Sequence, residues 1–173
     1  MERYRFELLT RSHARDQFSS GIPALDRYLQ QRALQDKRSR VAVPWVGTPD
    51  GRCIASYVAL CTTSIELALI PPQYSRRLPK YPHVPAALIG RLAVDQRYRG
   101  RGLGAMTLLH ALRLVVRGGE AIAAAAVVAD AKDASAAKFY FHFGFSRLSG
   151  TRVYLPIQRA EAMVRDLETN FPP

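Results

Sequence analysis

A glycine-rich turn between an apolar strand and a long apolar helix is the segment most suited to chemistry. The run Leu92-Ala93-Val94 leads into Arg97-Tyr98-Arg99-Gly100-Arg101-Gly102-Leu103-Gly104-Ala105. Glycines let the backbone take positive φ and approach a ligand closely. The unpaired amides at a helix N-terminus attract an anion, and the arginines add positive charge. The segment therefore predicts a binding site for a phosphate or pyrophosphate group.

Three anion-binding patterns can be compared with this turn. The Walker A pattern GxxxxGK[S/T] does not occur in the sequence. The dinucleotide pattern GxGxxG/A is met formally by Gly100, Gly102 and Ala105, but the turn lies too late in the chain for a doubly wound sheet to be built outward from it. The pattern (R/Q)xxGx(G/A), in which the turn holds the pyrophosphate of coenzyme A, is met by Arg99, Gly102 and Gly104. A purely structural turn remains an alternative.

A second block, residues 137–145, combines one phenol with several aromatic rings before a glycine. It reads Ala137-Lys138-Phe139-Tyr140-Phe141-His142-Phe143-Gly144-Phe145. A phenol held near a leaving group is a plausible general acid. From the chain alone, a core tyrosine with a satisfied hydroxyl is the simpler interpretation, and the phenylalanines are most simply packing residues.

Hydrophobic periodicity predicts the elements that must position these blocks. A helix opens at Pro23 and runs toward Arg38, and further helices cover 102–117, 135–143 and 158–168. Strands are expected at 4–9, 41–46, 53–63, 86–94 and 122–128, with one or two more in 146–157, while 71–85 is irregular. Strands and helices alternate, and no linker divides the chain. We expect one α/β domain spanning residues 1–173, built around a mixed sheet.

Composition excludes several classes of protein. With 173 residues, 48% apolar and 23% charged, the chain is neither collagenous nor disordered. Its longest apolar run, 121–129, is too short to span a bilayer, and its N-terminus lacks the apolar core of a secretion signal. We expect a soluble cytoplasmic protein that binds no metal, with Cys53 and Cys61 as buried reduced thiols in a strand.

The charge balance predicts a polyanionic partner. Lys and Arg total 25 against 14 Asp and Glu, and only four of the 25 are lysines. Arginine binds phosphate in a bidentate manner and stacks on bases, so this composition favours nucleic acid or another large polyanion. A generally basic protein from an arginine-rich genome is the alternative. Candidate contacts to an RNA backbone are the basic residues outside the turn: Arg32, Lys37, Arg38, Arg76, Arg77 and Lys80, with Arg40, Arg147 and Arg152.

The two blocks together resemble the GNAT acetyltransferase superfamily. Residues 92–104 are similar to its motif A, and residues 137–145 to its FYxxxGF helix end, in the same order and at the same separation. Residues 18–29 and 78–95 are similar to one branch, the acetyltransferase toxins of toxin–antitoxin modules. The resemblance covers residues 7–157. It implies a GNAT fold, acetyl-CoA as donor, the amino group of aminoacyl-tRNA as acceptor, a ribbon–helix–helix antitoxin as partner and a homodimer.

The resemblance also implies roles for individual residues. Tyr140 would protonate the departing thiolate, and the Val94 N–H would stabilise the oxyanion. In place of the family's asparagine seven residues before the tyrosine stands Asp133, which is expected to cap the following helix. The residues expected to bind acetyl-CoA are Leu92, Ala93, Val94, Arg99, Gly100, Arg101, Gly102, Leu103, Gly104 and Ala105.

No histidine stands out as a general base. His13, His83, His110 and His142 are the candidates. A dedicated base is dispensable for an α-amine, whose pKa of about 7.7–8.0 leaves a neutral fraction at pH 7. Two other functions stay open. One is a GNAT enzyme acting on a protein N-terminus, a lysine or a small amine, and the other is a non-catalytic basic module. Some basic residues could equally meet an acidic antitoxin tail.

Overall fold

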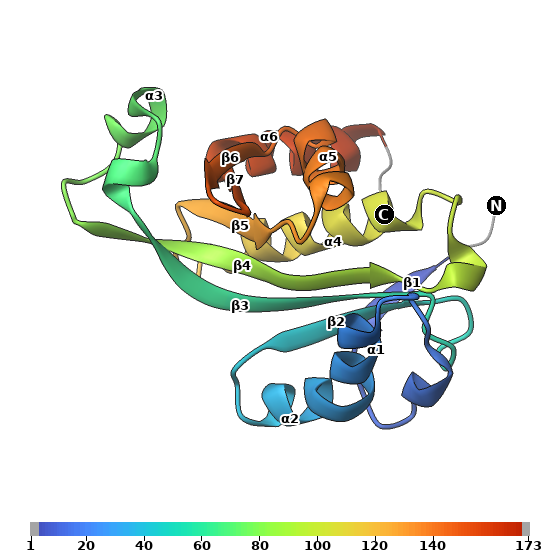
Figure 1. Ribbon diagram of the computed structural model, residues 1–173. Helices are drawn as coiled ribbons and strands as arrows, with labels where there is room; N and C mark the ends of the chain where they lie inside the picture. The colour runs from blue at the N-terminus through green and yellow to red at the C-terminus, as the bar shows by residue number, and fades with distance from the viewer. Residues whose placement is uncertain (1–3, 171–173) are drawn as a thin grey trace. The chain divides into compact units, whose positions relative to one another are not determined.

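The computed structural model describes residues 4–170, which form seven strands and a set of helices (Figure 1). The strands are β1 (Arg5–Leu8), β2 (Val43–Thr48), β3 (Ser56–Glu66), β4 (His83–Val94), β5 (Ala126–Asp130), β6 (Ser146–Ser149) and β7 (Arg152–Pro156). The α-helices are α1 (Pro23–Arg27), α2 (Ala33–Arg38), α3 (Pro72–Ser75), α4 (Leu103–Gly118), α5 (Ala134–His142) and α6 (Ile157–Asn170). A π-helical turn, η2 (Tyr28–Arg32), joins α1 to α2, and 3-10 turns are η1 (Arg15–Gln17), η3 (Leu67–Leu69) and η4 (Gln96–Tyr98).

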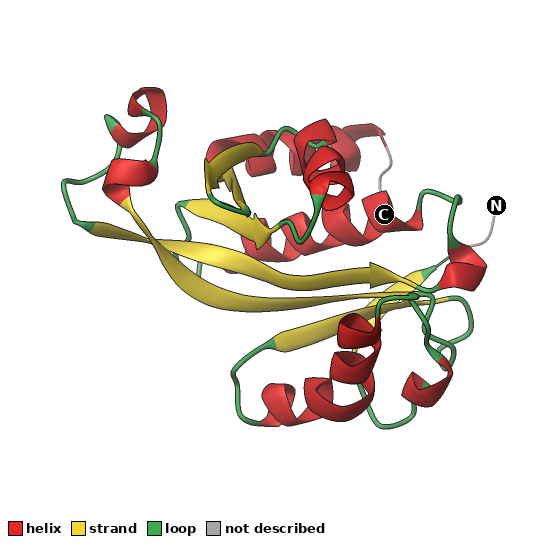
Figure 2. Ribbon diagram, viewed as in Figure 1, coloured by secondary structure: helices red, strands yellow, loops and turns green. Residues whose placement is uncertain are grey.

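The strands follow the order β1-β2-β3-β4-β5-β7-β6 in one mixed sheet (Figure 2). The pairs β1–β2, β2–β3, β5–β7 and β6–β7 are antiparallel, whereas β4 and β5 run parallel. The parallel pair is joined through α4, because parallel strands need a long crossover connection, which is usually a helix. The predicted α/β class with a mixed sheet is confirmed. No helix within residues 4–170 is both long and apolar enough to cross a membrane.

The chain forms two compact units. The N-terminal unit comprises Met1–Cys61 and Gly90–Ala111, and the C-terminal unit comprises Thr62–Ile89 and Leu112–Pro173. Strands β3 and β4 and helix α4 each contribute residues to both units. That one domain extends over residues 1–173 therefore stays a prediction, and the two units are considered separately.

Each unit has its own apolar core. In the N-terminal unit, the inner face of α1, η2 and α2 packs on the sheet, with Leu29 and Ala33 completely buried. The Tyr57 hydroxyl, buried in the same core, donates a hydrogen bond to the Leu25 carbonyl at 2.8 Å. In the C-terminal unit, Val128 and Tyr154 lie in a cluster between β5, β7 and the segment after β3. Burying these side chains stabilises each unit by roughly 1.5–3 kcal/mol per large residue.

Several predicted boundaries are wrong, for local reasons. Residues 71–85 are not wholly irregular, because Pro72 opens the short helix α3 and β4 already begins at His83. Strand β5 begins at Ala126 rather than 122, since α4 ends in a turn in which the Ile122 N–H donates to the Gly118 carbonyl. Ile122 is 69% exposed.

The cysteine prediction is also partly wrong. Cys53 precedes β3 in a turn whose amides bind the Asp50 carboxylate, so only Cys61 lies in the strand. Both thiols are free, as predicted, but they are half-buried rather than buried. A short polar turn ending next to an apolar strand is easily assigned to the strand, because Cys53 and Ile54 continue the apolar run.

A buried carboxylate closes the end of β4. Asp95 is 1% exposed, and its oxygens accept hydrogen bonds from the Ser19 N–H at 3.0 Å and the Arg97 N–H at 2.9 Å. The Arg97 guanidinium adds two bonds, both at 2.9 Å. Burial by itself would raise the pKa of Asp95, but these donors outweigh it, and the pKa lies below its usual value. The side chain therefore remains a carboxylate at neutral pH.

Replacing this carboxylate by an amide will destabilise the N-terminal unit. Asp95→Asn keeps the shape but weakens four charge-assisted bonds, so we expect a loss of about 2 kcal/mol in the free energy of unfolding. Because the pKa is lowered in the folded state, this contribution is present above about pH 4 and lost as the pH falls through the folded pKa. Urea unfolding at pH 7 and pH 3.5 measures both effects.

The matched control is Asp16→Asn, which changes an exposed carboxylate. It should leave unfolding unchanged. If Asp95→Asn were as stable as the parent at pH 7, or lost as much stability on acidification, the Asp95 network would not hold the turn.

Candidate active site

Strand β4 continues beyond its parallel partner and leaves backbone groups for a ligand. The β4–β5 register runs from Ala86↔Ala126 to Ile89↔Ala129, whereas β4 extends to Val94. The Asp95 N–H donates to the Ala55 carbonyl at 2.9 Å, on the side of β3. Because successive residues of a strand alternate, the N–H and C=O groups of Leu92 and Val94 face the opposite edge. Buried groups of this kind need partners, so this edge is suited to bind an extended amide-bearing ligand.

The turn after β4 adds an anion site at the start of α4. Gly100 and Gly102 have φ of +74° and +73°, a conformation that glycine adopts without strain. A Cβ at either position would meet no described protein atom within 4 Å, so the backbone is open to close approach. The first amides of α4, from Leu103 onward, lack intrahelical partners. Such a turn can hold a pyrophosphate.

The arginine side chains of this turn make contacts within the protein that the sequence did not predict. Arg97 is committed to Asp95, and Arg99 donates from Nη2 to the Ser20 carbonyl. Both side chains therefore fasten the turn to residues 17–20. The charge of Arg97 is paired with Asp95, whereas Arg99 donates to a neutral carbonyl and keeps its charge. Arg101 lies 5.5 Å from the centre of the Tyr98 ring. The backbone amides of the turn and of α4 are therefore the groups best suited to bind an anion here.

A buried polar pair, missed in the sequence, fixes α4 on the sheet. The Thr107 hydroxyl lies 2.7 Å from the Leu103 carbonyl and 2.7 Å from the Ser56 hydroxyl. Thr107 and Ser56 are both completely buried. The sequence feature that could have indicated the contact with Leu103 is the four-residue spacing of Thr107 from it, which places both residues on the buried face of the helix. This bond fastens the first turns of α4 to β3 at Ser56.

Tyr140 lies on the buried face of α5 in the C-terminal unit. The helix begins at Asp133, whose carboxylate accepts from the Ala136 N–H at 2.8 Å, so the predicted cap is confirmed. Tyr140 is 6% exposed and packs against Phe139 and Phe145 with ring centres 5.3 and 5.2 Å away. Burial raises the pKa of the Tyr140 phenol, and the charge of Asp130 raises it further. The phenol therefore keeps its proton at neutral pH and can act as an acid.

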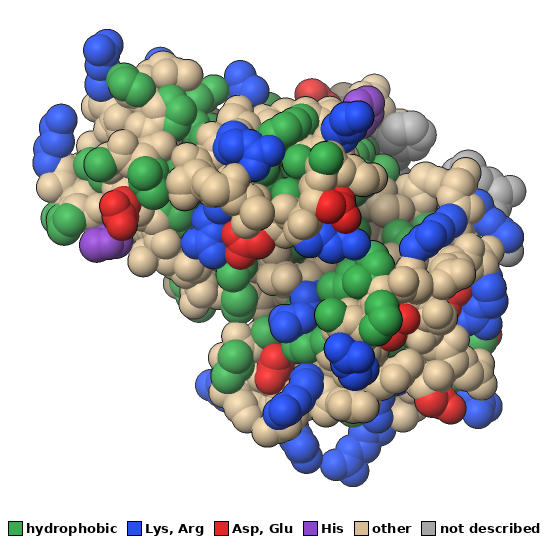
Figure 3. Space-filling model, in the orientation of Figure 1, with side chains coloured by type: hydrophobic (Ala, Val, Ile, Leu, Met, Phe, Trp, Pro, Cys, Tyr) green, Lys and Arg blue, Asp and Glu red, His purple; other side chains and the backbone are tan. Residues whose placement is uncertain are grey.

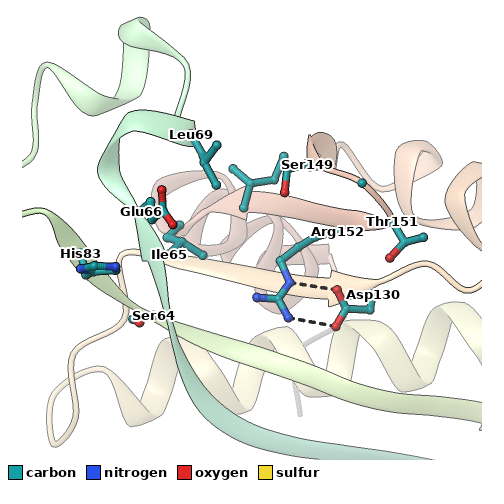
Figure 4. Close-up of a pocket in the computed structure, with 11 residues that line it drawn as sticks. Ser64, Ile65, Glu66, Leu69, His83, Asp130, Ser149, Thr151 and Arg152 are labelled. Atoms are coloured by element: carbon teal, nitrogen blue, oxygen red, sulfur yellow. Dashed lines mark hydrogen bonds and ion pairs between the residues drawn. The ribbon is translucent and has the colours of Figure 1, made fainter.

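A polar cavity of about 440 Å³ lies at the end of β5 in the same unit (Figure 4). Arg152, from β7, reaches Asp130, from β5, and binds both carboxylate oxygens at 2.9 and 3.0 Å. This pairing lowers the pKa of Asp130. His83 and Glu66 also line the cavity. The arrangement can hold a polar or charged group, and sequence reasoning had assigned Arg152 only to RNA.

Two histidines of the N-terminal unit, the buried His13 and the half-buried His110, have structural partners. His13 is 4% exposed, with Nε2 at 2.9 Å from Glu7 and Nδ1 accepting from the Thr10 N–H at 3.0 Å. His110 stacks on Phe6 and meets Trp45, with ring centres 4.6 and 5.1 Å apart. Within residues 4–170, no group of three or more His, Cys, Asp or Glu could hold a metal ion.

The predicted RNA-binding residues lie on or next to helices of both units: Arg32, Lys37 and Arg38 in the N-terminal unit, and Arg76, Arg77 and Lys80 after α3 in the C-terminal unit. In the N-terminal unit, Arg32 and Arg38 are exposed, but Lys37 is half-buried and donates to the Leu9 carbonyl at 2.7 Å. Lys37 and Arg38 line a cavity of about 460 Å³ together with Arg11 and Arg15, which the prediction missed. Figure 3 shows Lys and Arg side chains over α1 and α2.

In the C-terminal unit, the predicted basic residues follow α3. Arg76, Arg77 and Lys80 are all exposed, and Figure 3 shows Lys and Arg side chains over α3 as well. Tyr81, 66% exposed, comes directly after them. This segment combines positive charge with an exposed ring, the composition expected of a surface that binds a nucleic acid backbone.

Comparison with known proteins identifies the family. The model of the acetyltransferase (GNAT) domain matches residues 45–147, which include the β4 edge, the turn and Tyr140. The chain belongs to the GNAT acetyltransferase family and is an acetyl-CoA-dependent N-acetyltransferase.

One curated relative and two solved structures illustrate the similarity. The chain is 36% identical over 151 residues to a tRNA-acetylating toxin of Mycobacterium tuberculosis, covering 86% of this chain and 89% of the relative. The structure of AtaT complexed with acetyl-methionyl-tRNAfMet matches with a TM-score of 0.86 at 24% identity, over 93% of this chain and 99% of that chain. A Tyr-to-Phe variant of the AtaT toxin, bound to the C-terminus of the antitoxin AtaR and to acetyl-CoA, matches with a TM-score of 0.78 at 23% identity, over 92% and 97%. At these identities the two structures establish the fold.

Adding one methyl group in the turn will weaken acetyl-CoA binding more than folding. In Gly102→Ala, the new Cβ meets no protein atom of residues 4–170 within 4 Å, but it occupies space at the surface of the turn where the pyrophosphate would bind. The positive φ at this position costs an alanine about 1–2 kcal/mol. We expect the Kd for acetyl-CoA, measured by calorimetry, to rise at least tenfold. Gly118→Ala, at the far end of α4, is the control and should bind normally. An unchanged Kd in Gly102→Ala would place the pyrophosphate elsewhere.

Proposed function

We propose that this protein transfers the acetyl group of acetyl-CoA to the α-amino group of aminoacyl-tRNA, and so acts as the toxin of a toxin–antitoxin pair. The observation that carries the proposal is the β4 edge leading into the amide-rich turn, in a chain 36% identical to a tRNA-acetylating toxin. The basic helices supply the positive charge that a tRNA partner needs.

In this proposal, acetyl-CoA binds along the N-terminal unit. The pantetheine amides pair with the free edge of β4 at Leu92 and Val94, as a further strand would. The pyrophosphate lies over the turn and the first amides of α4. The proposed binding residues are those predicted from the sequence: Leu92, Ala93, Val94, Arg99, Gly100, Arg101, Gly102, Leu103, Gly104 and Ala105. Arg97 is added to them as a positioning residue, because it holds the turn through Asp95.

The reaction is a direct transfer with three proton and charge requirements. The neutral amine attacks the thioester carbon, the C–N bond forms and the C–S bond breaks. To the Val94 N–H, which faces away from β3, we assign the hydrogen bond to the carbonyl oxygen as negative charge develops there. The departing thiolate takes the Tyr140 proton, whose high pKa ensures that it is present at neutral pH.

The attacking amine loses its proton without a dedicated histidine. An α-amine has a pKa of about 7.7–8.0, so a neutral fraction exists at pH 7 and water can take the proton. The burial of His13 and the ring stacking of His110 agree with this, since both are occupied structurally. Tyr140 is restored to its acid form by solvent after each turnover.

We further propose an antitoxin partner and a homodimer. The solved complex of AtaT with the C-terminus of AtaR supports a protein antitoxin for this fold. A ribbon–helix–helix antitoxin and a dimer of this chain are the assembly implied by the resemblance to toxin acetyltransferases. The positive surfaces would then serve both tRNA and an acidic antitoxin segment.

Label transfer tests the proposed reaction. With [14C]acetyl-CoA and total charged tRNA, we expect label on the charged tRNA and none on deacylated tRNA. Tyr140→Phe should reduce kcat by at least tenfold, because the leaving thiolate loses its acid, while the Kd for acetyl-CoA stays the same. Tyr4→Phe is the matched control, since it removes a phenol that has no role in the mechanism. Acetyl-CoA binding without label on charged tRNA would favour a protein or small amine as acceptor.

Neutralising the basic segment after α3 tests tRNA docking. In Arg76→Gln/Arg77→Gln, we expect the KM for aminoacyl-tRNA to rise several-fold with the KM for acetyl-CoA unchanged, because phosphate contacts contribute affinity rather than chemistry. Arg113→Gln/Arg117→Gln, which removes two positive charges by breaking the ion pairs of both arginines with Glu168, is the charge-matched control. Equal effects on both substrates, or on neither, would contradict this assignment.

A further inference from the structure

A stacked arginine stands directly before the acetyl-CoA edge of β4. The Arg91 guanidinium carbon lies 3.7 Å from the centre of the Tyr28 ring, and both residues belong to the N-terminal unit. Arg91 is exposed, so one face of the guanidinium lies on the ring and much of the side chain meets solvent. Neither the fold nor the proposed chemistry above explains why an exposed arginine is held flat at this place.

The ring beneath Arg91 is fixed. Tyr28 is 5% exposed and packs in the core of the N-terminal unit, with its ring 6.3 Å from that of Tyr57. It begins the π-helical turn η2, a distortion that recurs at functional sites. Burial raises the pKa of Tyr28 to about 12, so the phenol is neutral and its electron-rich face attracts a cation. The cation on this face is thereby held in one orientation.

The charge of Arg91 is not neutralised by a partner. Within residues 4–170, no carboxylate lies within salt-bridge distance of Arg91, in contrast to Arg97, Arg113, Arg117 and Arg152. A structural arginine is normally paired or hydrogen-bonded. Arg91 instead keeps a preordered planar cation with its outer face and N–H edges available.

Its position in the strand brings this cation near the reacting carbonyl. Arg91 shares a face of β4 with Ala93, which is buried in the same cluster as Tyr28. At about 3.3 Å per residue, Arg91 is roughly 10 Å along the strand from the Val94 amide. In an aminoacyl-tRNA, the amine, the ester, the ribose and the terminal base are spread over a similar span. A base can therefore lie at Arg91 while the amine is at the thioester.

We propose that Arg91, held flat on Tyr28, is the platform on which the terminal base of aminoacyl-tRNA stacks, so that the ester and its amine are positioned at the acetyl group. The inference rests on the proposed function and names the part of the substrate that this side chain recognises. A base would stack on the outer face of the guanidinium that the Tyr28 ring holds in place, whereas a phosphate would bind its N–H edges, and the acceptor series below separates the two. Stacking of a base on an aromatic or guanidinium plane is sequence-tolerant and strong enough to orient a substrate.

A series of acceptors tests the platform. Arg91→Lys keeps the charge and removes the plane, and Arg52→Lys makes the same change at another exposed arginine of the N-terminal unit. Each is assayed with aminoacyl-tRNA, with the 3′-aminoacyl ester of adenosine and with the methyl ester of the same amino acid. For Arg91→Lys we expect kcat/KM to fall about tenfold or more on the first two acceptors. The methyl ester, which has no base, and the KM for acetyl-CoA should be unaffected, and Arg52→Lys should match the parent throughout.

Each other outcome overturns the inference in a recognisable way. An equal loss on the methyl ester would mean that Arg91 only supports β4. A loss on aminoacyl-tRNA but not on the adenosine ester would assign Arg91 to an upstream phosphate, and no loss would leave it without a role in the acceptor.

Failure of the proposed function has a different signature. The parent protein would then bind acetyl-CoA but acetylate neither aminoacyl-tRNA nor the adenosine ester. In that case the platform would also be refuted, because its substrate would not be an acceptor.

Discussion

The N-terminal unit depends on one buried carboxylate that joins three segments of the chain. Asp95 ends β4, receives the Ser19 amide from the segment before α1, and receives the backbone and guanidinium of Arg97 from the turn. A buried charge is unfavourable unless it is fully hydrogen-bonded. The chain can satisfy Asp95 only by placing these segments together. That placement fixes where the turn begins and which edge Val94 presents.

In the proposed site, side chains position the turn, and backbone amides are the groups proposed to bind the anion. Arg97 and Arg99 fasten the turn, and Thr107 bonds α4 to Ser56, so that the amides of the turn and of α4 converge. The positive φ at Gly100 and Gly102 brings those amides to the surface. A glycine pattern can therefore indicate the cofactor. In the proposed site the ligand contacts the backbone, and glycine adopts the required positive φ without strain.

The sequence predicted what depends on local pattern. The periodicity of α4 and α5, the glycine turn and the Asp133 cap all follow from neighbours a few residues apart, and they agree with the structure. Contacts between distant segments were not predictable. Nothing local indicated that Arg91 would lie on Tyr28 or that Arg152 would bind Asp130, since these partners are 63 and 22 residues apart in the numbering. Arg97 was misjudged because a count of charges does not show that a carboxylate two residues away has already bound it.

The scarcity of lysine has a chemical meaning for an enzyme that handles an activated acyl group. A primary amine near a thioester is itself an acceptor when it loses its proton, whereas a guanidinium stays protonated and is a poor nucleophile. Of the chain's four lysines, Lys37 is half-buried with its amine bonded to the Leu9 carbonyl. The positive surface is thus made almost wholly of groups that attract a polyanion without competing for the acetyl group. Such a surface offers few primary amines that could take the acetyl group in place of the substrate.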